Sequence, residues 1–319
     1  WQNDPKVLAV AIRGSNKEGP FGAFCAGGDI RFLHQAGSTG NPEIEDFFTE
    51  EYALNYLIHN YGKPYIAFMD GIVMGGGMGI SQGAALRLVT ERTKMAMPET
   101  AIGLFPDVGG GYFLSRCPGH VGEWLALTGD TFGAGDAIAF GMADGCLPLD
   151  AQAPLWDALG SQTFADGAAV KAFAASRMIA TGAILAGSRG QIDKYFSLDS
   201  VAAITAALEA ADSEWARSTA ATLRKRSPLM LNVVLEQIRR ARGMDLAQDL
   251  RMERDMVRHC FFLRPGRSET VEGIRALAVD KDHSPRWDPA RIEDVTPEMV
   301  APFFVSPWPA HAHPLTALR

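Results

Sequence analysis

Two acidic residues stand at positions from which they could do acid–base chemistry. Glu99 follows an apolar run, residues 94–97, that is ended by Pro98, and Asp107 lies in a glycine-rich loop at residues 103–111. Glycines let the chain and a substrate approach closely, so two loops at strand ends could bring both carboxylates to one reacting group. An isolated carboxylate after a strand is usually a solvated turn residue. Here the glycines around both carboxylates favour a catalytic role instead. General acid–base catalysis typically contributes about 10²- to 10⁴-fold in rate.

Two glycine-rich turns could stabilise negative charge on an oxygen atom. Gly27 and Gly28 precede Asp29, which is suited to cap a helix that starts near residue 30, and a triple glycine stands at residues 75–77. The triple glycine alone is more typical of close helix packing, but two strand-to-helix turns can each direct one NH group at a single oxygen. One donor of such an oxyanion hole is worth about 2.7–4 kcal/mol in the transition state. We therefore place the reaction centre in residues 71–111, with a second donor at Gly28.

The hydrophobic pattern indicates which elements position these residues. Four short apolar runs predict buried strands, at residues 7–12, 64–69, 86–89 and 94–97. They alternate with helical segments, which predicts an α/β fold with a parallel sheet and a site at the carboxyl ends of its strands. A helix is expected at residues 42–61, and Glu51 falls on its apolar stripe. Glu51 is either a rim residue that reaches water or a carboxylate directed into a pocket.

The chain changes character near residue 150, and its 319 residues fit a main core with a second lobe. Residues 1–150 are expected to form the α/β core. Residues 151–319 are expected to form a mainly helical lobe, with helices at residues 168–180, 201–211, 223–240 and 246–260. The chain begins at Trp1 and enters a strand almost at once, so we expect the natural protein to have a longer beginning.

Composition narrows the classes of protein that fit. Thirty basic and thirty-seven acidic side chains give a net charge of -7, which argues against a broad nucleic-acid surface, and no apolar run approaches the roughly 20 residues of a membrane span. The four cysteines are widely spaced and are expected to be reduced thiols. The spacing of the histidines does not match a metal site. No GxGxxG fingerprint follows a predicted strand, so no nicotinamide or flavin site is expected either. Arg224, Lys225 and Arg226 could meet phosphates, but such runs are usually solvated faces.

Three motifs resemble those of the crotonase superfamily, whose members bind acyl-coenzyme A thioesters. They are FCAGGDI at residues 24–30, MGGG at 74–77 and MPE at 97–99. The string MPETAIGLFPDVGG at 97–110 is similar to one branch, the 3-hydroxyisobutyryl-CoA hydrolases. The resemblance continues through LTGD at 127–130, RKRSP at 224–228 and EGIRA at 272–276, so it covers nearly the whole chain. It implies the crotonase fold, a spiral of ββα turns with a C-terminal helical lobe.

The resemblance also implies roles for individual residues. The NH groups of Gly28 and Gly76 would form the oxyanion hole for the thioester carbonyl. Glu99 would be the catalytic carboxylate, which either activates water or attacks the thioester to form an anhydride. Asp107 would engage the substrate 3-hydroxyl and assist proton transfer. Glu51 matches a glutamate that contacts substrate, which favours the second interpretation of its position.

One departure separates hydrolysis from hydration. Enoyl-CoA hydratases carry a second catalytic glutamate three residues after the oxyanion glycine, and this chain has Gly79 there. We therefore expect hydrolysis of 3-hydroxyisobutyryl-CoA, or of a similar short 3-hydroxyacyl-CoA, as in valine catabolism. The alternatives are a hydratase or isomerase of the same superfamily and an inactive scaffold that binds protein or RNA.

The expected partners follow from that chemistry. The resemblance implies an acyl-CoA substrate, coenzyme A as part of that substrate and no further cofactor. We expect no nucleic acid or membrane partner, and a homo-oligomer is possible. The expected location is the cytoplasm, or the mitochondrial matrix in a eukaryote.

Overall fold

The computed structural model describes the backbone of residues 1–319 and every side chain except that of Ala186. The chain divides into two compact units, each built from three separate segments. Unit 1 contains Trp1–Gly27, Leu54–Ala96 and Thr131–Arg189, and unit 2 contains Gly28–Ala53, Met97–Asp130 and Gly190–Arg319. The expected division near residue 150 is a different one and stays a prediction.

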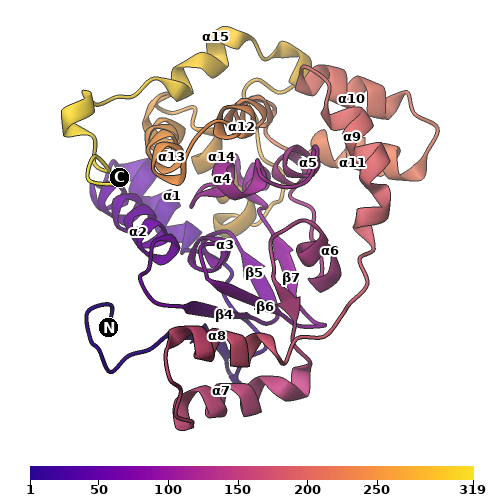
Figure 1. The fold of residues 1–319 in the computed structure, drawn as a ribbon. Coiled ribbons are helices and arrows are strands. Elements are labelled where there is room, and N and C mark those ends of the chain that lie inside the picture. The colour runs from indigo at the N-terminus through magenta and orange to yellow at the C-terminus, as the bar shows by residue number, and fades with distance from the viewer. The chain divides into compact units, whose positions relative to one another are not determined.

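Unit 1 is built around a parallel four-stranded sheet in the order β1-β4-β6-β8, of which Figure 1 labels β4 and β6. Its strands are β1 (Val10–Arg13), β4 (Tyr65–Met69), β6 (Leu86–Val89) and β8 (Gly145–Cys146). Val10 is in register with Tyr65, and Ile66 with Leu86. All five residues of β4 are buried, as expected of a central parallel strand. The predicted parallel sheet is therefore confirmed.

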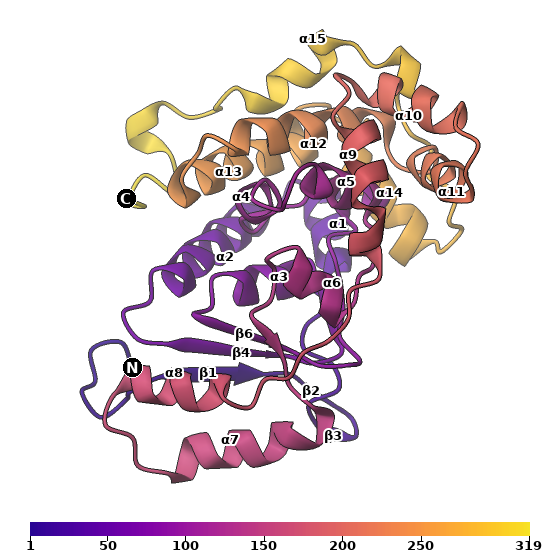
Figure 2. The ribbon, with the colours of Figure 1, turned by 45° about the vertical axis from the view of Figure 1, so that its right-hand side comes forward.

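Helices cover both faces of this sheet. Figure 2 shows α7 (Gln152–Ser161) and α8 (Gly167–Ala175) on one face, with α3 (Gly76–Gln82) and α6 (Ala134–Ala139) on the other. The side chains of Leu155 and Val170 join a buried cluster with Ile66, Phe68 and Leu88 of the sheet. A second parallel pair joins β5 (Ile72–Met74) to β7 (Lys94–Ala96), and β2 (Ser15–Asn16) pairs antiparallel with β3 (Gly19–Pro20).

Unit 2 consists of helices and loops in the described part of the chain. The helices are α1 (Ile30–Thr39), α4 (Gly110–Leu114), α5 (Val121–Thr128), α9 (Arg189–Phe196), α10 (Val201–Glu209), α11 (Glu214–Leu223), α12 (Pro228–Ala241), α13 (Leu246–Phe262), α14 (Glu269–Ile274) and α15 (Pro297–Val300). The unit boundary falls within α2 (Glu43–His59) and again after Arg189, the first residue of α9. Both α12 and α13 contact α4, and the three lie together in Figure 2.

Local sequence signals explain most helix ends. Asp29 accepts hydrogen bonds from the backbone NH groups of Arg31 and Phe32, which confirms the predicted cap of α1. The single helix predicted over residues 223–240 is wrong. The chain breaks after α11, and α12 begins at Pro228 behind the Ser227 cap, because proline lacks an NH group and suits the first turn of a helix.

No helix in the described part of the chain combines the length and the apolar character needed to cross a bilayer.

The two glycine turns approach each other closely inside unit 1. A Cβ atom at Gly77 would lie 2.3 Å from the carbonyl oxygen of Cys25, and one at Gly27 would lie 3.3 Å from the Gly76 nitrogen. Cys25 also forms a parallel bridge with Val73. Only residues without a side chain therefore let the start of α3 pack against the first turn.

We predict that Gly77→Ala destabilises the protein. The added methyl group meets backbone atoms that cannot move aside, so the free energy of unfolding should fall by about 1–3 kcal/mol or more in urea titrations. Gly160→Ala in α7 is the matched control, because nothing lies within 4 Å of its Cβ position. The control should be neutral or stabilising by up to about 1 kcal/mol. Equal effects of the two substitutions would contradict the packing.

Candidate active site

The three carboxylates singled out in the sequence all belong to unit 2. Glu51 lies on α2, Glu99 begins a 3-10 helix at Glu99–Ile102, and Asp107 lies in the loop before α4. Gly28 is also in unit 2, whereas Gly76 is in unit 1. The structure therefore brings together in one compact unit three side chains that are spread over more than fifty residues of sequence.

Asp107 is held in a buried and closely fixed loop. Its side chain is 6% exposed, and Oδ2 accepts a hydrogen bond of 2.9 Å from the hydroxyl of the fully buried Tyr52. The next residues, Val108 and Gly109, have φ angles of 59° and 87°, so the loop turns sharply after Asp107. Its carbonyl oxygen accepts from the Gly110 NH group. These contacts leave Asp107 little freedom to change its direction.

Glu99 is also 6% exposed, and its position follows from the turn that it begins. Pro98 stops β7, the 3-10 helix follows, and Gly103 ends the turn with a φ of 65° and an NH group directed at the Glu99 carbonyl. Within the described part of the chain, Oε2 of Glu99 has no hydrogen-bond partner. A buried carboxylate oxygen without a partner is costly, and functional sites are where such groups are found. It is available to a substrate or a water molecule.

Burial and mutual repulsion set the proton affinities of this cluster. Burial, followed by the charge of Asp107, raises the pKa of Glu51 to about 8 and holds the pKa of Glu99 well above its usual range. Burial also raises the pKa of Asp107 to about 6, against the hydrogen bond from Tyr52, which lowers it. The three carboxyl groups cannot all be ionised at neutral pH without a large cost, so the cluster holds protons that it can transfer. Groups with pKa values shifted in this way suit general acid–base catalysis.

Glu51 is half-buried, and the charge of Asp107 acts on it. A carboxylate on the predicted apolar stripe of α2 is therefore close enough to Asp107 to be affected by its charge. This supports the second interpretation of its position, while contact with a substrate stays a prediction.

Two residues that support this cluster were not predicted from the sequence. Tyr52 follows Glu51 on α2, and Glu253 lies on α13, more than 140 residues from the loop that it contacts. Both carboxylate oxygens of Glu253 accept backbone hydrogen bonds, from Gly109 at 2.8 Å and from Gly111 at 2.9 Å. Glu253 is fully buried on a helix rich in charged residues. A buried glutamate on such a helix has no local signal, because only its tertiary partners distinguish it from its solvated neighbours.

The two predicted oxyanion donors, Gly28 and Gly76, both lie in turns that precede or begin a helix. A Cβ atom at Gly28 would lie 3.1 Å from the ring of Phe47, so this position also has little room for a side chain. Gly76 is the first residue of α3 and follows Gly75, which has a φ of 52°. An NH group in the first turn of a helix has no intrahelical acceptor and can bind an external oxygen. An oxyanion hole made by Gly28 and Gly76 stays a prediction.

The basic run after α11 is engaged within unit 2. Arg224 pairs with Glu209 and Glu293, and Arg226 donates to the carbonyl oxygen of Thr128. These contacts favour the solvated and structural interpretation of the run over phosphate binding.

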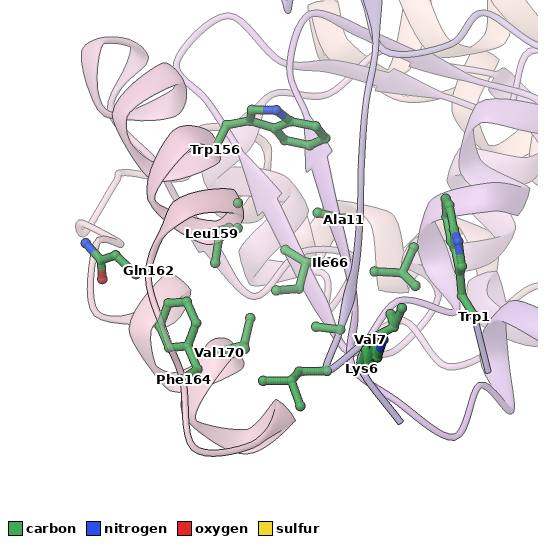
Figure 3. A pocket seen from close by; sticks show the side chains of 14 residues that line it. Trp1, Lys6, Val7, Ala11, Ile66, Trp156, Leu159, Gln162, Phe164 and Val170 are labelled. Carbon is green, nitrogen blue, oxygen red and sulfur yellow. The ribbon is translucent and has the colours of Figure 1, made fainter. Parts of the chain in front are cut away.

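Other candidate sites are weaker. The described residues contain no group of three or more histidine, cysteine or acidic side chains arranged to hold a metal ion. A cavity of about 480 Å³ in unit 1 is lined by apolar side chains such as Ile66, Trp156 and Phe164 (Figure 3). None of the five predicted site residues lines it. The carboxyl cluster is therefore the candidate active site.

The parallel sheet, the paired glycine turns and the buried carboxyl cluster are the features of an acyl-CoA enzyme with the crotonase fold. The chain belongs to the enoyl-CoA hydratase/isomerase family, whose model matches residues 1–304.

The names of similar proteins differ in the function that they describe. The mitochondrial 3-hydroxyisobutyryl-CoA hydrolase of Xenopus tropicalis is 38% identical over 96% of this chain and 79% of its own length. The small ribosomal subunit protein mS47 of Arabidopsis thaliana is also 38% identical, over 95% of this chain and 75% of its own. A crystal structure of a carnitinyl-CoA dehydratase from Mycobacterium thermoresistibile has a TM-score of 0.86 at 40% identity and covers 96% of this chain and 85% of that one.

The raised pKa of Glu51 predicts how stability depends on pH. Between its usual pKa of 4.5 and about 8, the folded protein binds more protons at Glu51 than the unfolded chain does, so this group lowers the free energy of unfolding as pH rises. Glu51→Gln should remove up to about 1.4 kcal/mol per pH unit from that slope, measured by urea unfolding across the window. The exposed neighbour Glu50 provides the control. If Glu50→Gln flattens the slope as much, Glu51 is not the group responsible.

Proposed function

We propose that the protein hydrolyses 3-hydroxyisobutyryl-CoA, or a similar short 3-hydroxyacyl-CoA, to the free hydroxy acid and coenzyme A. The observation that carries this proposal is the cluster of the buried Glu99 and Asp107 with the half-buried Glu51, in which one oxygen of Glu99 has no partner among the described residues. Curated relatives named 3-hydroxyisobutyryl-CoA hydrolase, at 35–38% identity over nearly the whole chain, support the same assignment.

The residues divide the reaction between charge stabilisation and proton transfer. The backbone NH groups of Gly28 and Gly76 bind the thioester oxygen as it becomes negative. Glu99 either draws a proton from water or attacks the thioester carbon itself, in which case water then cleaves the resulting anhydride. The carbon–sulfur bond breaks, the acyl carbon gains the hydroxyl of water, and sulfur leaves with a proton from the cluster. Asp107 binds the substrate 3-hydroxyl, which orients the acyl group.

A lyase of the same family is the second candidate, and the similarity to a carnitinyl-CoA dehydratase favours it. Two-glutamate hydration needs a second carboxylate on α3, but Gly79 occupies that position and is buried. Thiol release from 3-hydroxyisobutyryl-CoA distinguishes the two candidates. Hydrolysis frees the thiol, whereas hydration or dehydration changes the enoyl absorbance and leaves the thioester intact.

The ribosomal relative favours a third candidate, a scaffold that keeps the fold and has no catalytic role. Burying three carboxyl groups together costs free energy, and a scaffold gains nothing from that cost. The net charge of -7 also argues against an RNA surface. The cluster is therefore better explained by catalysis.

The proposed reaction belongs to valine catabolism. The relatives named for this hydrolysis are mitochondrial in animals, so a mitochondrial matrix location is proposed if this chain is eukaryotic and a cytoplasmic one if it is bacterial. We also propose that no cofactor is needed beyond the coenzyme A of the substrate. A homo-oligomer is compatible with this proposal.

We predict that Glu99→Gln abolishes thioester cleavage. The amide can neither attack the thioester nor accept a proton from water, so kcat should fall at least about 10²- to 10⁴-fold. A thiol-release assay with 3-hydroxyisobutyryl-CoA measures the loss. Glu91→Gln, at an exposed glutamate of unit 1, is the control and should keep full activity. Near-normal turnover by Glu99→Gln would reject the assignment of Glu99.

We predict that Asp107→Asn discriminates between substrates. If Asp107 binds the 3-hydroxyl, kcat/KM should fall by about 10- to 150-fold for 3-hydroxyisobutyryl-CoA, because charged hydrogen bonds contribute about 1.5–3 kcal/mol. The fall for isobutyryl-CoA, which differs only by the missing hydroxyl, should be smaller. An equal loss on both substrates would show that Asp107 acts on the thioester rather than on the hydroxyl.

A further inference from the structure

The loop that carries Asp107 is hydrogen-bonded to two helices of unit 2, to α12 before Asp107 and to α13 after it. Before Asp107, the carbonyl oxygen of Pro106 accepts a 2.7 Å hydrogen bond from Nε2 of Gln237 on α12. After Asp107, the NH groups of Gly109 and Gly111 donate to the two oxygens of Glu253 on α13. The same Gln237 nitrogen also donates to Glu253, at 3.3 Å. Both side chains are fully buried.

The loop sequence is adapted to this contact. A Cβ atom at Gly111 would lie 2.3 Å from Oδ1 of Asp249, so only glycine lets the loop reach α13. Asp249 stands one turn before Glu253 and accepts from the NH group of Tyr112 at 2.8 Å. Together the two acidic residues accept hydrogen bonds from three backbone NH groups at the start of α4, those of residues 109, 111 and 112. These donors have no acceptors within the helix, so the carboxylates of α13 cap α4 from outside.

Two acidic side chains this close would repel each other if both were ionised. Burial, and then the charge of Asp249, raises the pKa of Glu253 well above its usual range, and burial raises the pKa of Asp249 to about 6. The pair therefore keeps a proton at neutral pH. The positive charge of Arg116 lowers the pKa of Asp249, and the charge of Asp107 adds to the rise in the pKa of Glu253.

We infer that Glu253 is the positioning residue of Asp107: it binds the backbone on the far side of the turn and fixes the direction in which the Asp107 carboxylate points. A general contribution to stability would not require both oxygens of Glu253 to bind the one loop that bears a reacting group. Glu253 itself touches no reacting atom and acts only through Asp107. The inference rests on the proposed function only for the role of Asp107 toward the substrate.

The decisive experiment is a double-mutant cycle of Glu253→Gln with Asp107→Asn in the full chain. A glutamine has one acceptor oxygen in place of two and presents an NH₂ group to the other glycine NH, so the loop loses a contact and gains a clash. Glu253→Gln should lower kcat on 3-hydroxyisobutyryl-CoA by about 10- to 100-fold, because small misplacements of reacting groups have effects of this size. KM should change little. In the Asp107→Asn background the same substitution should lower kcat by less than about threefold, because the two act as one unit.

Glu123→Gln is the matched control, because Glu123 on α5 is a buried glutamate of unit 2 whose described ion pairs are with His120 and Arg242. It should lower the melting temperature as Glu253→Gln does but keep kcat. Multiplicative losses in the double mutant, or a loss of kcat in Glu123→Gln equal to that in Glu253→Gln, would overturn the positioning role and leave a structural one.

Amide hydrogen exchange separates this inference from the proposed function. Exchange at residues 109–112 should be faster in Glu253→Gln than in the wild type, and it is measured without turnover. If the wild type releases no thiol from any acyl-CoA, the proposed function fails while faster exchange still supports the contact. If exchange at these residues is unchanged, Glu253 does not fix the loop, and the inference fails whatever the activity.

Discussion

The burial of several carboxyl groups beside one another is the constraint on which the rest of unit 2 depends. Asp107 is buried, accepts a hydrogen bond from Tyr52 and raises the pKa values of Glu51 and Glu99. Buried acidic groups are tolerated only where hydrogen bonds or shared protons compensate for the lost water. The surrounding helices provide those contacts through backbone NH groups and neutral polar side chains, and the cluster retains protons at neutral pH.

The supporting structure comes from the C-terminal part of the chain. Gln237 on α12 binds the chain before Asp107, Glu253 on α13 binds it after Asp107, and Asp249 completes the cap of α4. Glycines at 109 and 111 are required for this approach, one for its backbone angle and the other because Asp249 fills the place of a side chain. The helices α12 and α13 therefore hold the Asp107 loop by hydrogen bonds, and none of the predicted site residues lies on them.

Family membership and reaction are separate conclusions for this chain. The family is established by a match over residues 1–304, yet the similar proteins include a hydrolase, a dehydratase and a ribosomal protein. What distinguishes the candidates is local: a carboxylate pair at 99 and 107 and a glycine at 79. The same fold supports different chemistry when one or two side chains around the oxyanion site change.

The sequence by itself determined four of the strands and the cap at Asp29, and it singled out Glu99, Asp107 and the glycine turns as candidates. These depend on short-range patterns, such as apolar runs ended by Pro98 or the cap at Asp29, that neighbouring residues specify. It did not reveal the break before Pro228, the contact of Tyr52 with Asp107 or the role of Glu253. Glu253 shows why: it lies among charged residues on α13, and nothing within several residues distinguishes it from a solvated glutamate. Its hydrogen-bond partners lie in a loop 142–144 residues away, and only the tertiary structure brings that loop within hydrogen-bond distance.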